Sequence, residues 1–120
     1  NLFVLVGPAT GLGHSSMIYM IESQLAYLVD ALRTMRDRGL ATVEVREAVQ
    51  DAYNAELRAD TGETVWVTGC SSWYLDAKGN APAVWPDFTF RFRDATRRFD
   101  LGAYHRTPTT DPVALQETTR

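Results

Sequence analysis

The sequence NLFVLVGPATGLGHSSM, residues 1–17, decides how the chain is expected to fold. Its first part, Leu2–Val6, is a continuous apolar run rich in β-branched residues, and Gly7-Pro8 closes it. Such a run is typical of a strand that is buried on both faces inside a parallel sheet. Because no comparable run follows, we expect the neighbouring strands to precede Asn1 and the chain to be a C-terminal segment of a larger protein.

A glycine-rich loop, Gly7–Gly13, leads from this predicted strand into a long predicted helix. Between Ser15 and Arg38, apolar residues recur at intervals of three and four, which is the pattern of one helical face. These residues are Met17, Ile21, Leu25, Leu28, Leu32 and Met35. Ser15 or Ser16 can cap the start of this helix, and Gly39 stands where a helix-ending glycine belongs.

Shorter elements follow. Ala41–Arg46 and Thr64–Val67 have the composition of strands, Glu47–Arg58 has helical periodicity, and Asp76–Asn80 has the residues of a turn. Phe88–Phe99 fits both an alternating strand and a helix capped by the preceding aspartate, and we prefer the helix.

The predicted fold class is α/β, or α+β for the segment alone. We divide it into a structured part at residues 1–100 and a tail at residues 101–120. This tail has little apolar content and two prolines, which predicts poor order.

The composition argues against several classes of protein. Twelve lysines and arginines face 15 aspartates and glutamates, so there is no basic excess to hold nucleic-acid phosphates. The longest apolar runs have five residues, far short of the roughly 20 that cross a membrane. Cys70 is the single cysteine, which excludes an internal disulfide and is compatible with a reducing cytoplasm. One cysteine and two distant histidines do not make a zinc site.

The loop and the helix start leave several functions open. Free N–H groups and the positive end of the helix dipole suit an electron-rich group, but the spacing G-x-x-x-G-x-G is not a known phosphate-binding pattern. A tight turn without a ligand is an equal alternative.

Gly13-His14-Ser15 is also similar to a nucleophile elbow, but Met17 replaces the closing glycine, which disfavours a small serine hydrolase. Trp73 and Tyr74 either fill the core or line a cofactor cleft.

The chain resembles the last FAD-domain segment of flavin-containing monooxygenases, most of all those of the Baeyer–Villiger type. The resemblance covers about residues 1–104. It is carried by NLF and GP at residues 1–8, GLGHSSM at 11–17, IESQ at 21–24 and SWY at 72–74, followed by the aromatic and basic stretch 88–99. It implies a Rossmann-like FAD domain and an enzyme that uses NADPH and O2 to oxygenate a ketone or a soft heteroatom through a flavin C4a-peroxide.

The resemblance also implies which residues lie near the cofactors. The residues that it places beside the flavin are Gly7, Pro8, Gly11, Leu12, Gly13, His14 and Met17. It places Trp73 on the NADP and substrate side. It assigns no catalytic residue and no metal ligand to this segment. Both dinucleotide fingerprints and the active-site arginine of the family are absent from the 120 residues, so we expect the isolated chain to bind neither FAD nor NADP and to be inactive.

The expected partners are the rest of the same flavoprotein fold and a small organic substrate, in the cytoplasm and without nucleic acid or membrane. An orphaned strand and helix would expose apolar surface, so we expect the isolated chain to form homo-oligomers. The alternative to an enzyme segment is a helical interaction or oligomerisation module.

Overall fold

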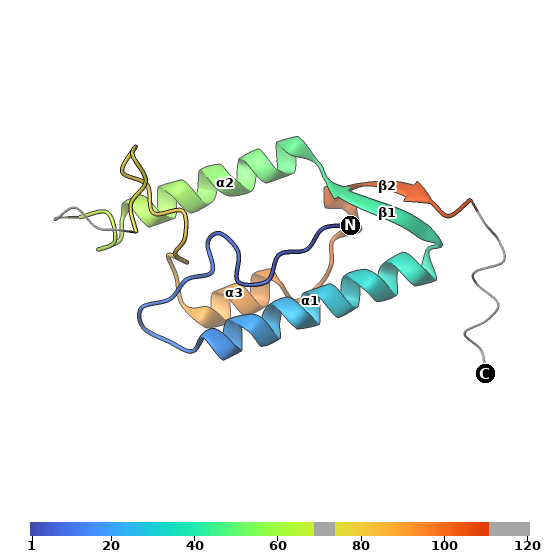
Figure 1. The fold of residues 1–120 in the computed structure, drawn as a ribbon, viewed down its shortest axis with the longest axis horizontal. Coiled ribbons are helices and arrows are strands. Elements are labelled where there is room, and N and C mark those ends of the chain that lie inside the picture. Colours follow the sequence, from blue (N-terminus) through green and yellow to red (C-terminus); the bar gives the residue numbers. More distant parts are fainter. Residues whose placement is uncertain (69–73, 111–120) are drawn as a thin grey trace.

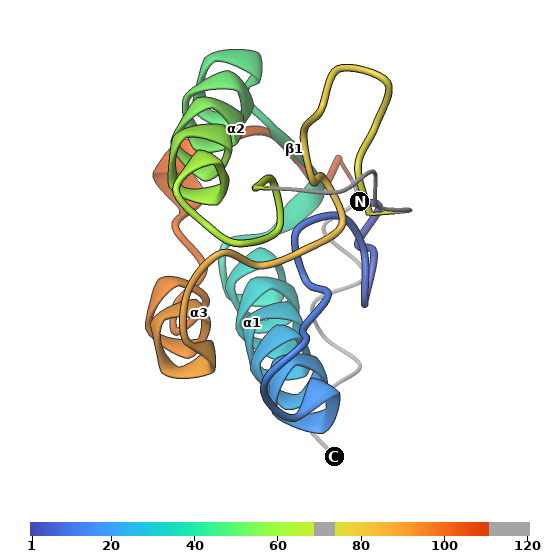
Figure 2. The same cartoon turned by 90° about the vertical axis from the view of Figure 1, so that its left-hand side faces the viewer.

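The computed structural model describes residues 1–68 and 74–110. Along the chain come helix α1 (Met17–Asp37), strand β1 (Leu40–Val45), helix α2 (Glu47–Gly62), helix α3 (Thr89–Ala95), a 3-10 turn (Leu101–Ala103) and strand β2 (Tyr104–Pro108). Figures 1 and 2 show α3 lying beside α1, with β1 leading from the end of α1 to α2. The described part of the chain is thus a mixture of helices with a two-stranded antiparallel sheet.

Helix α1 confirms the long helix that the apolar periodicity predicts. Arg38 is its C-cap, and Gly39 has φ +61°, so the helix-ending role of this glycine is confirmed. The expected capping hydrogen bond from a serine does not form. Ser16 occupies the N-cap position, but its hydroxyl makes no capping hydrogen bond, and the first turn carries no acidic residue.

The first predicted strand, Leu2–Val6, does not form. Val6 has φ +55°, a conformation that is rare for a β-branched residue, and its N–H donates to Gln24 Oε1 at 3.0 Å. A strand requires a hydrogen-bonded neighbour, and neither strand of the described sheet pairs with this run. The run therefore stays irregular, with Leu2 88% exposed.

The middle of the chain confirms some expected elements and corrects others. Helix α2 continues to Gly62, and Thr64–Val67 forms turns instead of a strand, because Thr64 bonds back to the carbonyl oxygen of Thr61. The turn at Asp76–Asn80 is confirmed by a hydrogen bond from Gly79 N–H to Asp76 O at 3.0 Å.

The helix expected at Phe88–Phe99 is confirmed but shorter than expected. It is α3, which ends at Ala95, and Phe88 is its N-cap residue instead of Asp87.

Residues 101–108, which were expected to belong to a poorly ordered tail, form a 3-10 turn and strand β2. Strand β2 pairs antiparallel with β1, so that Val43 faces Arg106 and Val45 faces Tyr104. The pairing gives β1 a partner for its backbone, and the ring of Tyr104 packs on that of Phe99 with centroids 4.6 Å apart. Residues 111–120 of the predicted tail lie outside the described residues.

Two small clusters form the core. Ala31, Met35, Val43 and Phe99 join α1 to β1 and to the segment after α3. Met20, Trp85 and Phe92 join the start of α1 to α3. In the part of the chain that the structure describes, nine apolar residues are buried and fourteen large apolar residues are exposed, so the fold leaves much of its apolar surface uncovered.

Tyr27 links α1 to β2 through a 2.8 Å hydrogen bond between its hydroxyl and that of Tyr104. Burial, followed by this hydrogen bond, raises the pKa of Tyr27 well above its ordinary value of 10.0.

Above pH 10, Tyr27 ionises in the unfolded chain but not in the folded one, so the free energy of unfolding should fall as the pH rises further. We predict this fall in the urea midpoint between pH 8 and pH 11, and a smaller fall in Tyr27→Phe. Tyr19→Phe is the control, and an equal fall in all three proteins would contradict the prediction.

Candidate functional site

The glycine-rich loop is held by backbone hydrogen bonds to the segment that precedes α3. Gly11 N–H donates to Ala83 O at 2.7 Å, and Gly11 O accepts from Trp85 N–H at 2.9 Å. Gly11 and Val84 thereby form an isolated parallel bridge. A Cβ atom on Gly11 would lie only 2.7 Å from Ala83 O, so this position requires glycine for a close contact with its own chain.

Beyond Gly11 the loop becomes accessible and is surrounded by aromatic rings. Gly13 lies against the Trp66 indole, because a Cβ atom there would be 2.5 Å from the Trp66 ring. Trp66 in turn packs edge-on against Tyr74, with ring centroids 5.1 Å apart. The exposed His14 approaches Phe88 edge-on at 6.3 Å. We call Trp66, Tyr74 and Phe88 the aromatic rim of the loop.

Sequence reasoning missed Trp66 and Phe88 as neighbours of this loop. Trp66 lies in a predicted strand, and Phe88 lies on a predicted helix whose partner was unknown. Neither belongs to a spacing pattern that connects it to Gly13 or His14, which are about 50 and 70 positions away in the sequence. Only the tertiary contacts bring these residues together.

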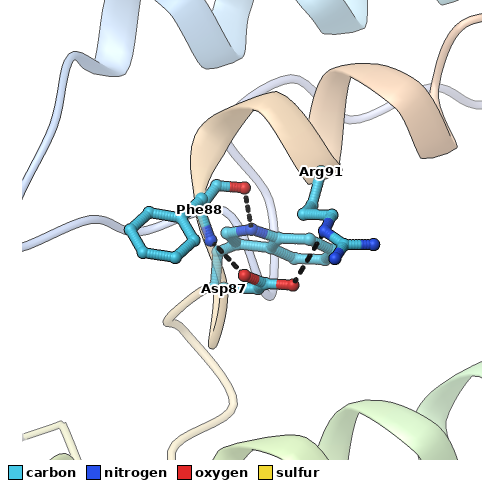
Figure 3. A network of polar contacts seen from close by, with 4 residues as sticks. Asp87, Phe88 and Arg91 are labelled. Carbon is cyan, nitrogen blue, oxygen red and sulfur yellow. Dashed lines mark hydrogen bonds and ion pairs between the residues drawn. The ribbon is translucent and has the colours of Figure 1, made fainter.

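Phe88 is held in place by polar contacts at the start of α3, as Figure 3 shows. Its carbonyl oxygen accepts from Trp85 Nε1 at 3.1 Å, and its N–H donates to Asp87 Oδ1 at 2.6 Å. The second oxygen of Asp87 lies 3.9 Å from Arg91 Nε. These contacts fix the backbone that carries the Phe88 ring next to His14.

The start of α1 completes the accessible part of the site. Because Ser16 does not cap it and no acidic side chain lies in the first turn, its first N–H groups have no side-chain acceptor from the capping positions. The positive end of the helix dipole adds to these donors. An uncapped helix start beside aromatic rings offers the donors that the polar edge of a planar, electron-rich ring system, such as the ring of FAD, would require.

The structure places the implied cofactor residues in different surroundings. Exposed are Pro8, Gly13 and His14, and half-buried are Gly7, Gly11, Leu12 and Met17. The side chains of Leu12 and Met17 pack against the cluster of Met20, so they offer a ligand mainly backbone atoms. Trp73 lies outside the described residues, as does Cys70. Cofactor contact stays a prediction for all eight residues.

For the nucleophile-elbow alternative, the hydrogen-bond contact of the serine is with a threonine hydroxyl and not with a histidine. Ser15 Oγ lies 3.4 Å from Thr89 Oγ1, within hydrogen-bond distance. The other histidine, His105, is on β2 and pairs with Glu44 of β1. Within residues 1–68 and 74–110, no group of three His, Cys, Asp or Glu side chains could hold a metal ion. No helix in these ranges is long and apolar enough to cross a membrane.

Comparison with known proteins finds a relative that matches along the whole chain. The chain is 52% identical, over 122 aligned residues, to a Baeyer–Villiger monooxygenase of Pseudomonas aeruginosa. This match covers the whole chain and 23% of that protein. The chain is homologous to a segment of Baeyer–Villiger monooxygenases. A second such enzyme, from Streptomyces coelicolor, is 49% identical over 87% of the chain and 20% of its own length.

The resemblance inferred from the sequence motifs is thus confirmed. An FAD-binding monooxygenase of Aspergillus niger is 33% identical over 78% of the chain and 16% of its own length. The chain spans less than a quarter of the length of these Baeyer–Villiger and FAD-binding relatives. No protein-family model and no solved structure matches it significantly.

Gly11→Ala tests whether the loop depends on its close contact with Ala83. The added methyl group collides with a backbone oxygen, so we predict a loss of about 1–3 kcal/mol in the free energy of unfolding. Gly62→Ala is the matched control, since nothing lies within 4 Å of its Cβ position at the end of α2. Thermal unfolding followed by circular dichroism measures both. Equal melting temperatures for Gly11→Ala and wild type would contradict the close contact.

Proposed function

We propose that the chain is the flavin-facing segment of an FAD- and NADPH-dependent monooxygenase of the Baeyer–Villiger type. The whole enzyme would use O2 to oxygenate a ketone or a soft heteroatom of a small organic substrate. The observation that carries this proposal is the 52% identity, over the entire chain, to a protein named as such a monooxygenase. The uncapped helix start beside an exposed glycine loop supports it independently.

Within the enzyme, the residues of this chain would bind and orient the flavin ring. Bound FAD supplies the redox chemistry that activates O2. The N–H groups at the start of α1 would stabilise negative charge on the pyrimidine edge of the ring, and Gly13 would allow close approach of the backbone. The aromatic rim would exclude water on the side of Trp66 and Phe88.

For the second cofactor we propose a role of Trp73 on the NADP and substrate side. Trp73 directly precedes Tyr74, whose ring packs on Trp66. The pyrophosphate-binding fingerprints would come from the rest of the enzyme, so the chain by itself should bind neither cofactor and should be inactive.

A chimera tests the proposal. The segment of the Pseudomonas aeruginosa relative that matches this chain is replaced by residues 1–120, and the purified protein is examined for FAD absorbance. NADPH-dependent conversion of a cyclic ketone to a lactone, and of a thioether to a sulfoxide, is then followed by mass spectrometry. We expect FAD binding and at least one of the two activities. A folded chimera without FAD, beside a relative that contains it, would contradict the proposal.

Charge at the start of α1 gives a sharper test within this chimera. Ser16→Asp and Ser16→Asn both supply a good helix cap, but only aspartate adds negative charge near the proposed flavin edge. We therefore predict a flavin midpoint potential about 10–30 mV lower in Ser16→Asp than in Ser16→Asn, equivalent to roughly 0.5–1.4 kcal/mol for two electrons. Spectroelectrochemical titration measures the difference. Equal potentials in the two variants would show that the flavin edge lies elsewhere.

A further inference from the structure

A cavity of about 310 Å³ lies beside the glycine-rich loop, between the loop, the C-terminal part of α2 and the segment before α3. The turn Asp76–Asn80 contributes a further part of its lining. Among the described residues that are implied to contact the flavin, Pro8 alone lines it. We call it the α2 cavity. Its volume is that of a site for a small organic molecule.

Part of the lining of the α2 cavity is apolar. Leu57 of α2 is half-buried, and Ala81 and Val84 are 3% and 2% exposed. Pro8 and Pro82 add two proline rings. These side chains would remove the apolar body of a ligand from water.

Asn54 and Arg58 supply polar groups from α2. They are four residues apart, so they lie on the same face of the helix. Within residues 1–68 and 74–110, neither side chain makes a hydrogen bond or an ion pair. The residues three and four positions from Arg58, where ion pairs form along a helix, include no acidic residue. The Arg58 guanidinium is therefore available to an anion in the cavity.

Asp76 is the acidic residue of the lining, and its carboxylate is engaged by its own turn. Oδ1 accepts from Lys78 N–H at 2.8 Å and from Asn80 N–H at 2.9 Å, and Oδ2 accepts from Asn80 Nδ2 at 3.1 Å. The bond from the Asn80 side chain lowers the pKa of Asp76, so this carboxyl is charged at neutral pH. One fixed negative charge and one available cation favour a ligand with a single negative charge over a dianionic phosphate.

We propose that the α2 cavity binds a small organic carboxylate, with the carboxylate on Arg58 and an apolar body against Leu57 and Val84. A guanidinium fits a carboxylate through two parallel hydrogen bonds, and the Asn54 amide can donate a third. This binding site is distinct from the proposed flavin edge at the start of α1. It does not depend on the function proposed above.

A ligand in the α2 cavity would also contact the glycine-rich loop. Pro8 and Ala9 line the cavity, and Ala9 N–H donates to Pro82 O at 2.8 Å. Pro82 lines the cavity too, so a bound ligand touches both partners of this hydrogen bond. Binding should therefore stabilise the contact between the loop and the segment before α3, and the Ala9 amide reports it.

Titration of the 120-residue chain with 3-phenylpropionate tests the proposal. The control ligand is 3-phenylpropionamide, which has the same shape and no charge. We expect the carboxylate to bind at least about fivefold more tightly, to shift the amide NMR signals of Ala9 and Asn80, and to slow hydrogen exchange at Ala9. Equal affinities for the two ligands, binding of neither, or shifts confined to β1 would overturn it.

Substitution of Arg58 identifies the group that holds the carboxylate. Arg58→Gln should weaken binding of 3-phenylpropionate at least about fivefold and remove the preference over the amide, and Arg58→Lys should fall between this variant and wild type. Arg33→Gln is the matched control, because it removes the same charge from an exposed position on α1 outside the cavity. Both arginines are exposed, so the melting temperatures should not change. Equal affinities of Arg58→Gln and Arg33→Gln would contradict the assignment.

Two further ligands and the chimera decide between other occupants. Phenyl phosphate that binds more tightly than 3-phenylpropionate would overturn the choice of a carboxylate, and tighter binding of 2-phenylethylamine would assign the cavity to Asp76 instead of Arg58. The chimera described above should keep the preference for the carboxylate over the amide. Binding to the isolated chain but not to the chimera would show that the rest of the enzyme fills the cavity, which would overturn the inference.

Discussion

The backbone bridge between Gly11 and the residues before α3 is the contact on which the arrangement of this molecule depends. Residues 11 and 83–85 are far apart in the sequence, and between them lie α1, β1 and α2. Two hydrogen bonds at 2.7 and 2.9 Å close this long loop. They also place Trp85 over Met20 at the start of α1 and set the point from which α3 begins. The accessible part of the glycine loop thus projects from a fixed base.

The two loop glycines serve different contacts, and this difference explains how structure and site share one loop. Gly11 makes room for Ala83 of its own chain, whereas Gly13 lies under the ring of Trp66 and is exposed. A substitution at Gly11 therefore acts first on stability. At Gly13 the neighbour is a side chain that can move, so the same change acts first on the surface that the proposed cofactor would meet.

The sequence predicted the parts of the fold that depend on local pattern. Helix α1, the glycine after it and strand β1 each appear where expected. The buried side of α1 differs from the predicted face, because Met20, Ser23, Ala31 and Met35 are buried whereas Leu25 and Leu32 are exposed. The failures depend on partners that lie far away in the sequence. Tyr104–Pro108 is too polar to read as a strand alone, but it is ordered by pairing with β1 and by its contact with Phe99. Conversely, Leu2–Val6 has a strand sequence but no partner strand in the described chain, so its propensity is not realised.

The distinction between local patterns and distant partners also applies to the candidate site. The motifs around Gly7–Met17 led to the monooxygenases to which the chain is similar, because they belong to one continuous stretch of sequence. The aromatic rim could not be foreseen, since Trp66 and Phe88 come from separate segments.

The N-terminal run, Leu2–Val6, is held at its two ends and is irregular in between. Asn1 is bonded to the outer edge of β1, where its side-chain amide donates to Ala41 O at 2.7 Å and accepts from Val43 N–H at 2.8 Å. Val6 is bonded to Gln24 at the other end of the run. The N-terminal ammonium of Asn1 also donates to Val43 O at 3.1 Å, whereas the anchor at Val6 is a side-chain amide alone. These bonds fix the ends of the run without pairing its middle. The positive φ of Val6 thus lies at the second anchor, and the N–H groups of Phe3, Val4 and Leu5, which have no acceptor among the described protein atoms, lie between the two anchors.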